Sequence, residues 1–229
     1  MSRHVLHEDP TSRNSYKVKL TASLVNTPLS LKAYSVLRGE TRTSSFLKNV
    51  NPMGKIPVLE VGSGPSTVFL PESNAACFYL ADIAHSPLIP SDPLERADML
   101  HWMFFEQYAH LPNISTLRYW IKFVGEENLT DEQRALMPDK RKKGEEALDV
   151  MEGHLQAGSP GNASYGLPRK WFVGQGEGSL SLADLVLFAY TEVAAEAGFA
   201  LGTGKWKRIE EWCVMMREVS EGGFYSHHS

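Results

Sequence analysis

The sequence predicts an α/β domain followed by an all-helical domain. Strand-like and helix-like segments alternate over roughly the first 84 residues, and no convincing strand follows them. A proline-bearing segment at 85–92 is typical of a linker between domains. Because 229 residues are enough for one large domain or two small ones, we expect domains at 1–84 and 93–229.

The first domain is predicted from short apolar runs separated by turn signals. The expected elements are a strand at Val5-Leu6, a helix at 14–24, a strand at 29–36, a helix at 43–49, strands at 58–61 and 67–70, and a helix at 73–83. Segment 29–36 alternates apolar and polar residues, and Gly62-Ser-Gly-Pro65 marks a hairpin loop. The predicted order is therefore β-α-β-α-β-β-α.

The second domain begins with a helix-capping signal. Asp92 is expected to cap, with Pro93 at the first helical position and Glu95 reaching back. The helix that follows carries apolar residues three and four positions apart, at Ala97, Leu100, Phe104, Tyr108 and Leu111. Further helices are predicted at 138–155, 182–197 and 205–219. Segment 182–197 is apolar almost all round and starts with Ser181-Leu-Ala-Asp184, so we expect a buried central helix.

Composition argues against several classes of protein. With 23 basic and 27 acidic residues the net charge is -4, and the run Lys140–Lys143 reads as a solvated helix face, so we expect no nucleic-acid partner. No apolar stretch approaches the roughly 20 residues that span a bilayer. The N-terminus lacks the apolar core of a signal peptide, so we expect a cytoplasmic protein that does not bind membranes. Cys77 and Cys213 lack metal-ligand spacing, which predicts buried reduced thiols and no metal site.

The most informative stretch runs from Asn51 to Ser73. Pro57 opens the apolar run Val58-Leu59, and a proline belongs at the first residue of a strand because it cannot donate a ladder hydrogen bond. The Ile56–Pro57 bond is a candidate cis peptide that would expose the backbone of Ile56 to a ligand. Glu72-Ser73 falls at a predicted helix start, which attracts carboxylates. Together these features favour a site for a small, charged, extended peptide.

Three motifs carry a resemblance to the soluble glutathione transferases. They are Asn51-Pro-Met-Gly-Lys-Ile-Pro-Val-Leu59, Glu72-Ser-Asn-Ala-Ala-Cys-Phe-Tyr-Leu80 and Ser181-Leu-Ala-Asp184, in this order. The resemblance covers nearly the whole chain, from Val5 to about Val219. Theta-like bacterial and fungal members look most similar, judged from residues 12–18, 39–43 and 102–108.

The resemblance implies a thioredoxin-like first domain that binds glutathione as co-substrate. By analogy with the family, Glu72 and Ser73 would hold the γ-glutamyl end, and the backbone of Ile56 would pair with the cysteinyl part. Lys55 sits where relatives often place a polar residue near the glycyl carboxylate. The family also implies a homodimer, and a second domain that supplies most of the pocket for a hydrophobic electrophile.

The chemistry requires a group that stabilises a thiolate, because an unperturbed thiol with a pKa of roughly 8.5 is only slightly ionised at neutral pH. Alignment at Val18 with theta-like members places Ser12 on their catalytic serine, and Asn14 matches an asparagine used by some bacterial relatives. Alternatively, Ser12 and Asn14 only cap the first helix. Tyr16 is in register with Leu20 and Leu24, so we expect it in the core. No cysteine lies in this loop, which argues against mixed-disulfide chemistry.

The sequence thus predicts a glutathione S-transferase active in detoxification or specialised metabolism. Phe105, Tyr108, Arg118 and Tyr119 are candidates for the electrophile pocket, with core packing as the competing interpretation for the aromatic side chains. Two other functions stay open on the same scaffold: a glutathione-dependent isomerase or disulfide reductase, and a ligandin-like binding protein without turnover. Glu72 could also act purely as a helix cap, and Lys55 could be an ordinary surface lysine.

Overall fold

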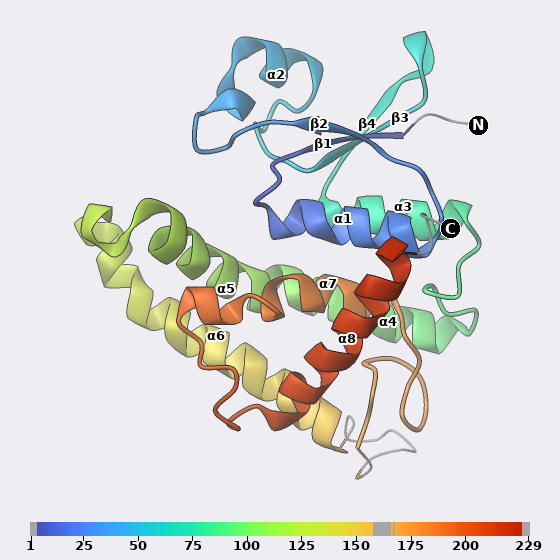
Figure 1. Ribbon diagram of the computed structural model, residues 1–229, viewed down its shortest axis with the longest axis vertical. Helices are drawn as coiled ribbons and strands as arrows, with labels where there is room; N and C mark the ends of the chain where they lie inside the picture. The colour runs from blue at the N-terminus through green and yellow to red at the C-terminus, as the bar shows by residue number, and fades with distance from the viewer. Residues whose placement is uncertain (1–3, 158–165, 167, 226–229) are drawn as a thin grey trace. The chain divides into compact units, whose positions relative to one another are not determined.

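The chain folds into two compact units, seen in the computed structural model of Figure 1. The structure describes residues 4–157, 166 and 168–225. Residues up to Ile89, with the end of the chain from Ser220, form the first unit, and Pro90–Val219 form the second.

The first unit is a four-stranded sheet with helices on both faces. Its elements are β1 (His4–Glu8), α1 (Arg13–Leu24), β2 (Ser30–Ala33), η1 (Glu40–Arg42), α2 (Ser44–Asn49), β3 (Val58–Val61), η2 (Gly64–Ser66), β4 (Val68–Pro71) and α3 (Ser73–Ile83). The strand order is β2-β1-β3-β4, with β2 parallel to β1 and the other two pairs antiparallel. The predicted order β-α-β-α-β-β-α is confirmed, and with it the thioredoxin-like class.

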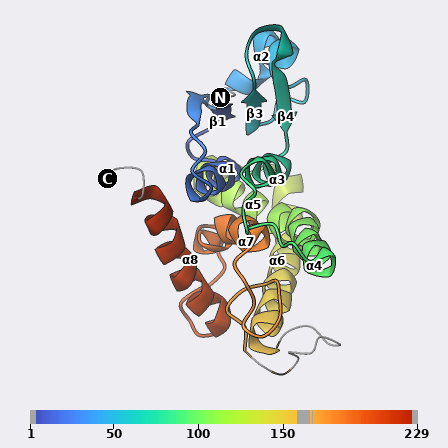
Figure 2. The ribbon, with the colours of Figure 1, turned by 90° about the vertical axis from the view of Figure 1, so that its right-hand side faces the viewer.

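The two faces of this sheet have different roles. Figure 2 shows α1 and α3 side by side under the sheet, with α2 beyond its other face. Leu6 and Leu59 face each other across β1 and β3, and both are fully buried. Because side chains alternate along a strand, His7 points to the opposite face from Leu6, toward the side covered by α2. A charged network can therefore form behind the sheet while its apolar face packs on α1 and α3.

The second unit is helical. From residue 90 onward the elements are α4 (Pro93–Phe105), η3 (Glu106–His110), α5 (Leu111–Arg118), η4 (Tyr119–Val124), η5 (Glu126–Asn128), α6 (Asp131–Ala157), α7 (Leu182–Thr191), η6 (Ala194–Ala197) and α8 (Lys207–Tyr225). The short segments η3 and η4 are π-helical. Within the described part of the chain no strand follows β4, apart from one isolated bridge between Val173 and Ser179. The expected all-helical architecture is confirmed.

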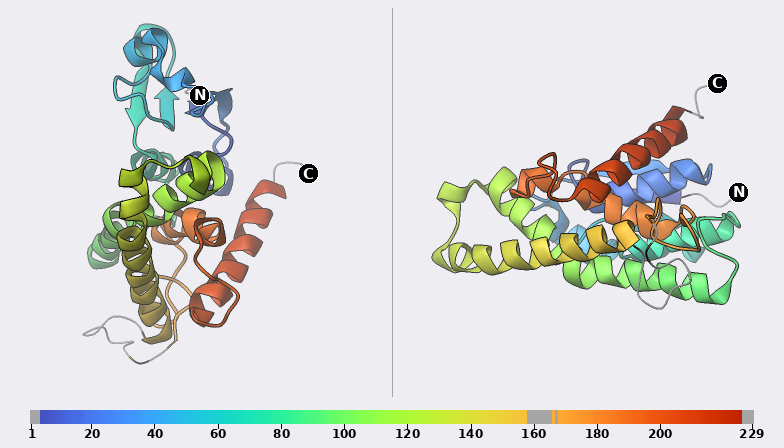
Figure 3. Two further views of the ribbon diagram at one scale, coloured as in Figure 1. Left: turned by 90° about the vertical axis from the view of Figure 1, so that its left-hand side faces the viewer. Right: turned by 90° about the horizontal axis from the view of Figure 1, so that it is seen from below.

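Helix α7 is the buried centre of this unit, as the sequence predicts. All ten of its residues are buried, and it contacts α4 and α5, as the two views of Figure 3 allow the reader to follow. Ser181 and Asp184 form a reciprocal capping box at its start. The helix ends at Thr191, earlier than the predicted 197. The Thr191 hydroxyl donates to the carbonyl of Leu187, a bond that favours bending, and the chain continues as the 3₁₀ turn η6.

Helix α6 begins seven residues before the predicted start at Pro138. The missed signal is Thr130-Asp-Glu-Gln133, a capping box in which each end bonds the other. The backbone N–H of Gln133 donates to Thr130 Oγ1 at 3.2 Å, and that of Thr130 donates to Gln133 Oε1 at 2.9 Å. Pro138 therefore lies inside the helix, where a proline is tolerated only at the loss of one backbone hydrogen bond.

The buried face of α4 is not the apolar stripe that the spacing indicates. Phe104 and Tyr108 of that stripe are 66% and 75% exposed, whereas Trp102 and Phe105 are buried. Trp102 packs against Phe105 at 5.2 Å and against His154 at 4.6 Å between ring centroids. Two adjacent faces of this helix are apolar, so periodicity by itself selects neither one.

The remaining calculable features agree with an ordinary folded interior. Cys77 and Cys213 are buried thiols, as predicted, and burial raises the pKa of Cys213 to about 12. Among the residues that the structure describes, no helix is long and apolar enough to cross a membrane.

Two glycines of α6 should respond in opposite ways to alanine. A Cβ at Gly144 would lie 2.3 Å from Cζ of the buried Phe199 ring, whereas one at Gly153 would meet nothing within 4 Å. We expect Gly153→Ala to stabilise the protein by about 0.5–1 kcal/mol, the usual gain of alanine over glycine in a helix. We expect Gly144→Ala to destabilise it by about 1–3 kcal/mol through overpacking. Urea unfolding midpoints at constant slope measure both, and a stabilised Gly144→Ala would contradict the packing described for Phe199.

His154 should make the stability depend on pH. Burial lowers the pKa of His154 to about 4, despite the opposing effect of its Nε2–H bond to the carbonyl of Phe172 at 2.8 Å. Below pH 6.5 the unfolded chain takes up this proton before the folded chain does, so stability falls as the pH drops from 6.5 to about 4. The full loss attributable to His154 is about 3 kcal/mol.

The matched test is His154→Gln, whose side-chain amide can still donate to the Phe172 carbonyl. Its stability should fall less steeply than that of the unsubstituted protein over this window, measured by urea unfolding at a series of pH values. The exposed His85, which has a φ of +48°, provides the control His85→Asn, because asparagine tolerates that backbone conformation. Parallel pH curves for His154→Gln and the unsubstituted protein would exclude His154 as the cause.

Candidate functional site

The starts of α1 and α3 bring together the two motifs that the sequence singles out. Ser73 Oγ donates to Asn14 Oδ1 at 3.4 Å, across 59 residues of sequence. Asn14 lies in the first turn of α1, and Ser73 is the first residue of α3. Each helix start presents backbone N–H groups without intrahelical partners and the positive end of the helix dipole. The structure therefore places two anion-attracting helix ends beside each other in the first unit.

Ser12 is the N-cap residue of α1. Its Oγ accepts from the backbone N–H of Ser15 at 3.3 Å, and its own backbone N–H donates to the carbonyl of Asp9 at 2.9 Å. The cap uses a lone pair of the hydroxyl, which leaves the O–H proton to be donated elsewhere. Capping and hydrogen bonding to a ligand are therefore compatible for this side chain. Tyr16, by contrast, is half-buried rather than in the core, with the Arg13 guanidinium 4.0 Å from its ring centroid.

Glu72 occupies the N-cap position of α3 without capping it through its side chain. It is exposed, and no hydrogen bond joins its carboxylate to the first turn of the helix. Its backbone has φ 71° and ψ 115°, a conformation that costs a non-glycine residue on the order of 1–3 kcal/mol. Such strain is found where a side chain or backbone group serves a ligand. This geometry argues against the interpretation of Glu72 as a plain helix cap.

The loop before β3 presents Lys55 and Ile56. The Ile56–Pro57 peptide bond is cis, as predicted. Lys55 is exposed, and its carbonyl accepts from Asn51 Nδ2 at 2.9 Å, so the loop is held from within. Gly54 has a φ of +62°, and a Cβ there would lie 3.0 Å from the carbonyl oxygen of Thr41, so this position requires glycine.

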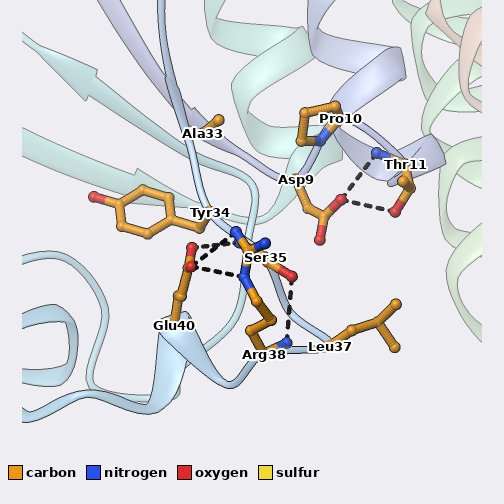
Figure 4. Close-up of a pocket in the computed structure, with 9 residues that line it drawn as sticks. All are labelled: Asp9, Pro10, Thr11, Ala33, Tyr34, Ser35, Leu37, Arg38 and Glu40. Atoms are coloured by element: carbon orange, nitrogen blue, oxygen red, sulfur yellow. Dashed lines mark hydrogen bonds and ion pairs between the residues drawn. The ribbon is translucent and has the colours of Figure 1, made fainter.

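Asp9 joins two loops that border this region (Figure 4). Its Oδ1 accepts from the backbone N–H and the hydroxyl of Thr11 at 2.9 and 2.7 Å. Its Oδ2 accepts from the backbone N–H of Val36 at 2.9 Å. Burial would raise the pKa of Asp9, but these hydrogen bonds and the nearby Arg38 hold it below its ordinary value. The carboxylate is ionised at neutral pH and fixes the β1–α1 loop to the segment after β2.

Tyr34 is held from behind by the sheet. His7 lies 2.8 Å from Glu60 through Nε2 and 3.0 Å from the Tyr34 hydroxyl through Nδ1, and its ring stacks on that of Tyr34. Burial lowers the pKa of His7, against the opposing effect of Glu60. A neutral His7 that donates to Glu60 accepts from the Tyr34 hydroxyl. In Figure 4 this hydroxyl points away from Asp9, so the tyrosine offers its ring edge to the loop region.

A pocket of roughly 290 Å³ opens between the two loops that Asp9 connects. Its walls come from residues 9–11 and from 33–40, with Leu37 facing the Asp9–Thr11 loop. Glu40 Oε2 accepts from the backbone N–H of Ser35 at 2.7 Å, and Oε1 lies 3.0 Å from Arg38 Nη2. The hydrogen bond from Ser35, followed by that from Arg38, lowers the pKa of Glu40. The Arg38 charge is therefore already compensated by a carboxylate.

The four candidates in the second unit have unequal surroundings. Phe105 is buried against Trp102, which matches the core interpretation. Arg118 is only 8% exposed and forms an ion pair with Glu196 at 2.6 Å. Tyr108 and Tyr119 are exposed. The structure thus leaves the two tyrosines accessible within this unit, while Arg118 has a carboxylate partner that any bound anion would have to displace.

Sequence reasoning missed Asp9 and the segment 33–40 as parts of a site. The available signal was Asp9-Pro10-Thr11, since an aspartate two residues before a polar residue favours a turn closed by its own side chain. The partner Val36 lies 27 residues away, and no local pattern identifies it. Within the described residues, no group of His, Cys, Asp or Glu is arranged to hold a metal ion.

Fold and site together define a class: a thioredoxin-like unit with paired helix starts and a helical second unit. Residues 6–82 match the family model described as glutathione S-transferase, N-terminal domain. A crystal structure of a glutathione S-transferase from Pseudomonas fluorescens is 37% identical, with a TM-score of 0.77 over 93% of this chain and 94% of that one. The chain belongs to the glutathione transferase family. These matches do not confirm the theta-like subtype that the sequence suggests.

Relatives with different names share this similarity. Glutathione S-transferase F14 of Arabidopsis thaliana is 34% identical over 122 residues, which cover 52% of this chain and 46% of that protein. Elongation factor 1-gamma of Artemia salina is 29% identical over 198 residues, covering 84% of this chain and 40% of that protein. The chain thus spans less than half the length of these relatives. A Pseudomonas fluorescens family member with two glutathione bound, 22% identical at a TM-score of 0.77 over 96% and 92% of the two chains, shares the fold.

Asp9→Asn should weaken the link between the two loops. An amide can accept at only one of its two positions, so at least one N–H donor loses its partner, at a cost of about 1–3 kcal/mol at pH 7. Because the folded pKa of Asp9 is depressed, its stabilising contribution is present above the unfolded value and is lost as the pH falls through the folded pKa. The difference between the two proteins should therefore shrink toward acid pH, as measured by urea unfolding.

Thr11→Val is the graded control for Asp9→Asn, because it removes only the hydroxyl donor to Oδ1. Its cost should be smaller, about 0.5–1.5 kcal/mol. Equal stability of Asp9→Asn and the unsubstituted protein at pH 7 would show that this carboxylate does not hold the loops.

Proposed function

We propose that this protein is a glutathione transferase that binds glutathione in its first unit and directs the thiolate at a hydrophobic electrophile. The observation that carries the proposal is the Ser73–Asn14 hydrogen bond, which sets the starts of α1 and α3 beside each other. An extended tripeptide with two carboxylates suits two such helix ends. Family membership supports glutathione as the ligand.

In this proposal the γ-glutamyl end lies at the start of α3. Ser73 contributes its hydroxyl and backbone N–H, and the strained, exposed Glu72 faces the ammonium group of the ligand. The backbone of Ile56, beside the cis bond, pairs with the cysteinyl part. Lys55 is exposed next to it and supplies a positive charge for the glycyl carboxylate.

Thiolate stabilisation falls to Ser12, assisted by Asn14. The capped Ser12 hydroxyl keeps its proton for the sulfur, and the amide N–H groups of Asn14 stay available while its oxygen accepts from Ser73. A hydrogen bond to a charged acceptor contributes about 1.5–3 kcal/mol. Since one pKa unit corresponds to about 1.4 kcal/mol, this bond and the dipole of α1 suffice to lower the thiol pKa by one to two units.

Ser12→Ala should raise the pKa of the bound glutathione thiol by about one unit or more. Turnover with a model aryl halide should fall roughly tenfold at neutral pH and recover as the pH rises, because only the ionised fraction changes. Ultraviolet absorbance of the thiolate against pH reports the pKa, and calorimetry reports glutathione affinity, which should stay within about twofold. Ser12→Thr keeps the hydroxyl and serves as the control.

Asn14→Ala separates the two donors. Because Asn14 also contacts Ser73, its loss should weaken glutathione binding as well as raise the thiol pKa. Rates of Ser12→Ala that match the unsubstituted protein at every pH would remove Ser12 from the catalytic role and leave Asn14 as the main donor.

A glutathione-binding protein without turnover is the second candidate. Similarity to elongation factor 1-gamma favours it, since that name denotes no transferase activity. Retention on immobilised glutathione, lost in Glu72→Ala, without consumption of glutathione by a panel of electrophiles would support this reading over the first. Product analysis would also detect an isomerase, which returns the tripeptide unchanged. We further propose a homodimer, which sedimentation analysis tests directly.

A further inference from the structure

We infer that the pocket between the β1–α1 loop and the segment 33–40 receives the uncharged, apolar substituent on the glutathione sulfur, with Leu37 as a specificity-determining residue. The inference rests on the proposed function, because it takes the glutathione sulfur to lie at Ser12. It assigns part of the electrophile site to the first unit, where the sequence predicted that the helical domain would supply most of it.

Position along the chain connects this pocket to the reacting atom. Its wall at Thr11 is the residue directly before Ser12, and the Ser12 backbone N–H is bonded to the carbonyl of Asp9 in the same wall. An atom bonded to a sulfur at the Ser12 hydroxyl is therefore next to the pocket. The loop cannot drift away from it, because the Asp9 carboxylate ties Thr11 to Val36.

Charge decides what the pocket accepts. Asp9 and Glu40 carry depressed pKa values and are ionised at neutral pH, against the one guanidinium of Arg38. Both oxygens of Asp9 accept hydrogen bonds from the two loops, and Glu40 is paired with Arg38. A second carboxylate, such as the glycyl end of glutathione, would meet net negative charge and a cation already in use. The set of groups disfavours an anion there.

Apolar side chains supply the attraction that remains. Leu37 is 55% exposed, and Ala33, Pro10 and the ring of Tyr34 complete the apolar wall, as Figure 4 shows. A pocket of roughly 290 Å³ is at the lower end of the range for small-molecule sites, so it suits a short alkyl chain or a single ring. Burying such a group against Leu37 removes apolar surface of both partners from water.

The test compares glutathione, S-methylglutathione and S-hexylglutathione by calorimetry. The hexyl chain should add affinity over the methyl group in the unsubstituted protein. Leu37→Trp fills the pocket and should reduce S-hexylglutathione affinity at least tenfold, while glutathione and S-methylglutathione stay within about twofold. Leu37→Ala removes apolar contact without adding bulk and should reduce the hexyl advantage about threefold.

Leu31→Trp is the matched control, because Leu31 is also 55% exposed, lies on β2 and does not line the pocket. It should leave all three affinities unchanged, and circular dichroism verifies that each variant is folded. A hexyl advantage that survives both Leu37 substitutions overturns the inference. An equal loss of glutathione affinity in Leu37→Trp also overturns it, since the pocket would then hold the peptide. Failure of the unsubstituted protein to bind glutathione at all refutes the proposed function itself, and the inference with it.

Discussion

The carboxylate of Asp9 is the interaction on which the first unit's functional region depends. It accepts three hydrogen bonds from two loops that are 27 residues apart, and it does so nearly out of contact with water. A buried carboxylate is costly unless donors surround it, so the two loops and the charge stabilise each other. Removing the charge would leave N–H groups without acceptors. The position of Ser12, three residues later, follows from this arrangement because its backbone N–H donates to the carbonyl of Asp9.

The second unit uses the same physical principle at its centre. Asp184 is fully buried, and it accepts from the backbone N–H of Ser181 and Phe172 and from the indole N–H of Trp212. Burial raises the pKa of Asp184 to about 6, and the hydrogen bonds partly offset that effect. The capping box of α7 is thus also a junction for two distant segments. In both units a carboxylate that starts as a local turn or cap signal becomes a tertiary contact.

Much of the fold was predictable because its signals are local. Pro57, the glycine-rich hairpin, the caps at Asp92 and Ser181, and the apolar sequence of α7 each mark an element within a few residues. The start of α6 was missed although its capping box was readable, because Pro138 was taken as the stronger signal. The packed face of α4 was not readable. Trp102 is selected by contacts with side chains on other elements, which spacing does not encode.

The sequence by itself determined the order of elements, the two-unit organisation of helices and strands, the family, and the residue types at both helix starts. Tertiary structure alone decided that Asn14 and Ser73 meet, and that Asp9 ties its loop to Val36. It also decided that Arg118 is occupied by Glu196. The reason is physical: caps and turns are made by neighbours along the chain, whereas a pocket is made by groups that only packing brings together.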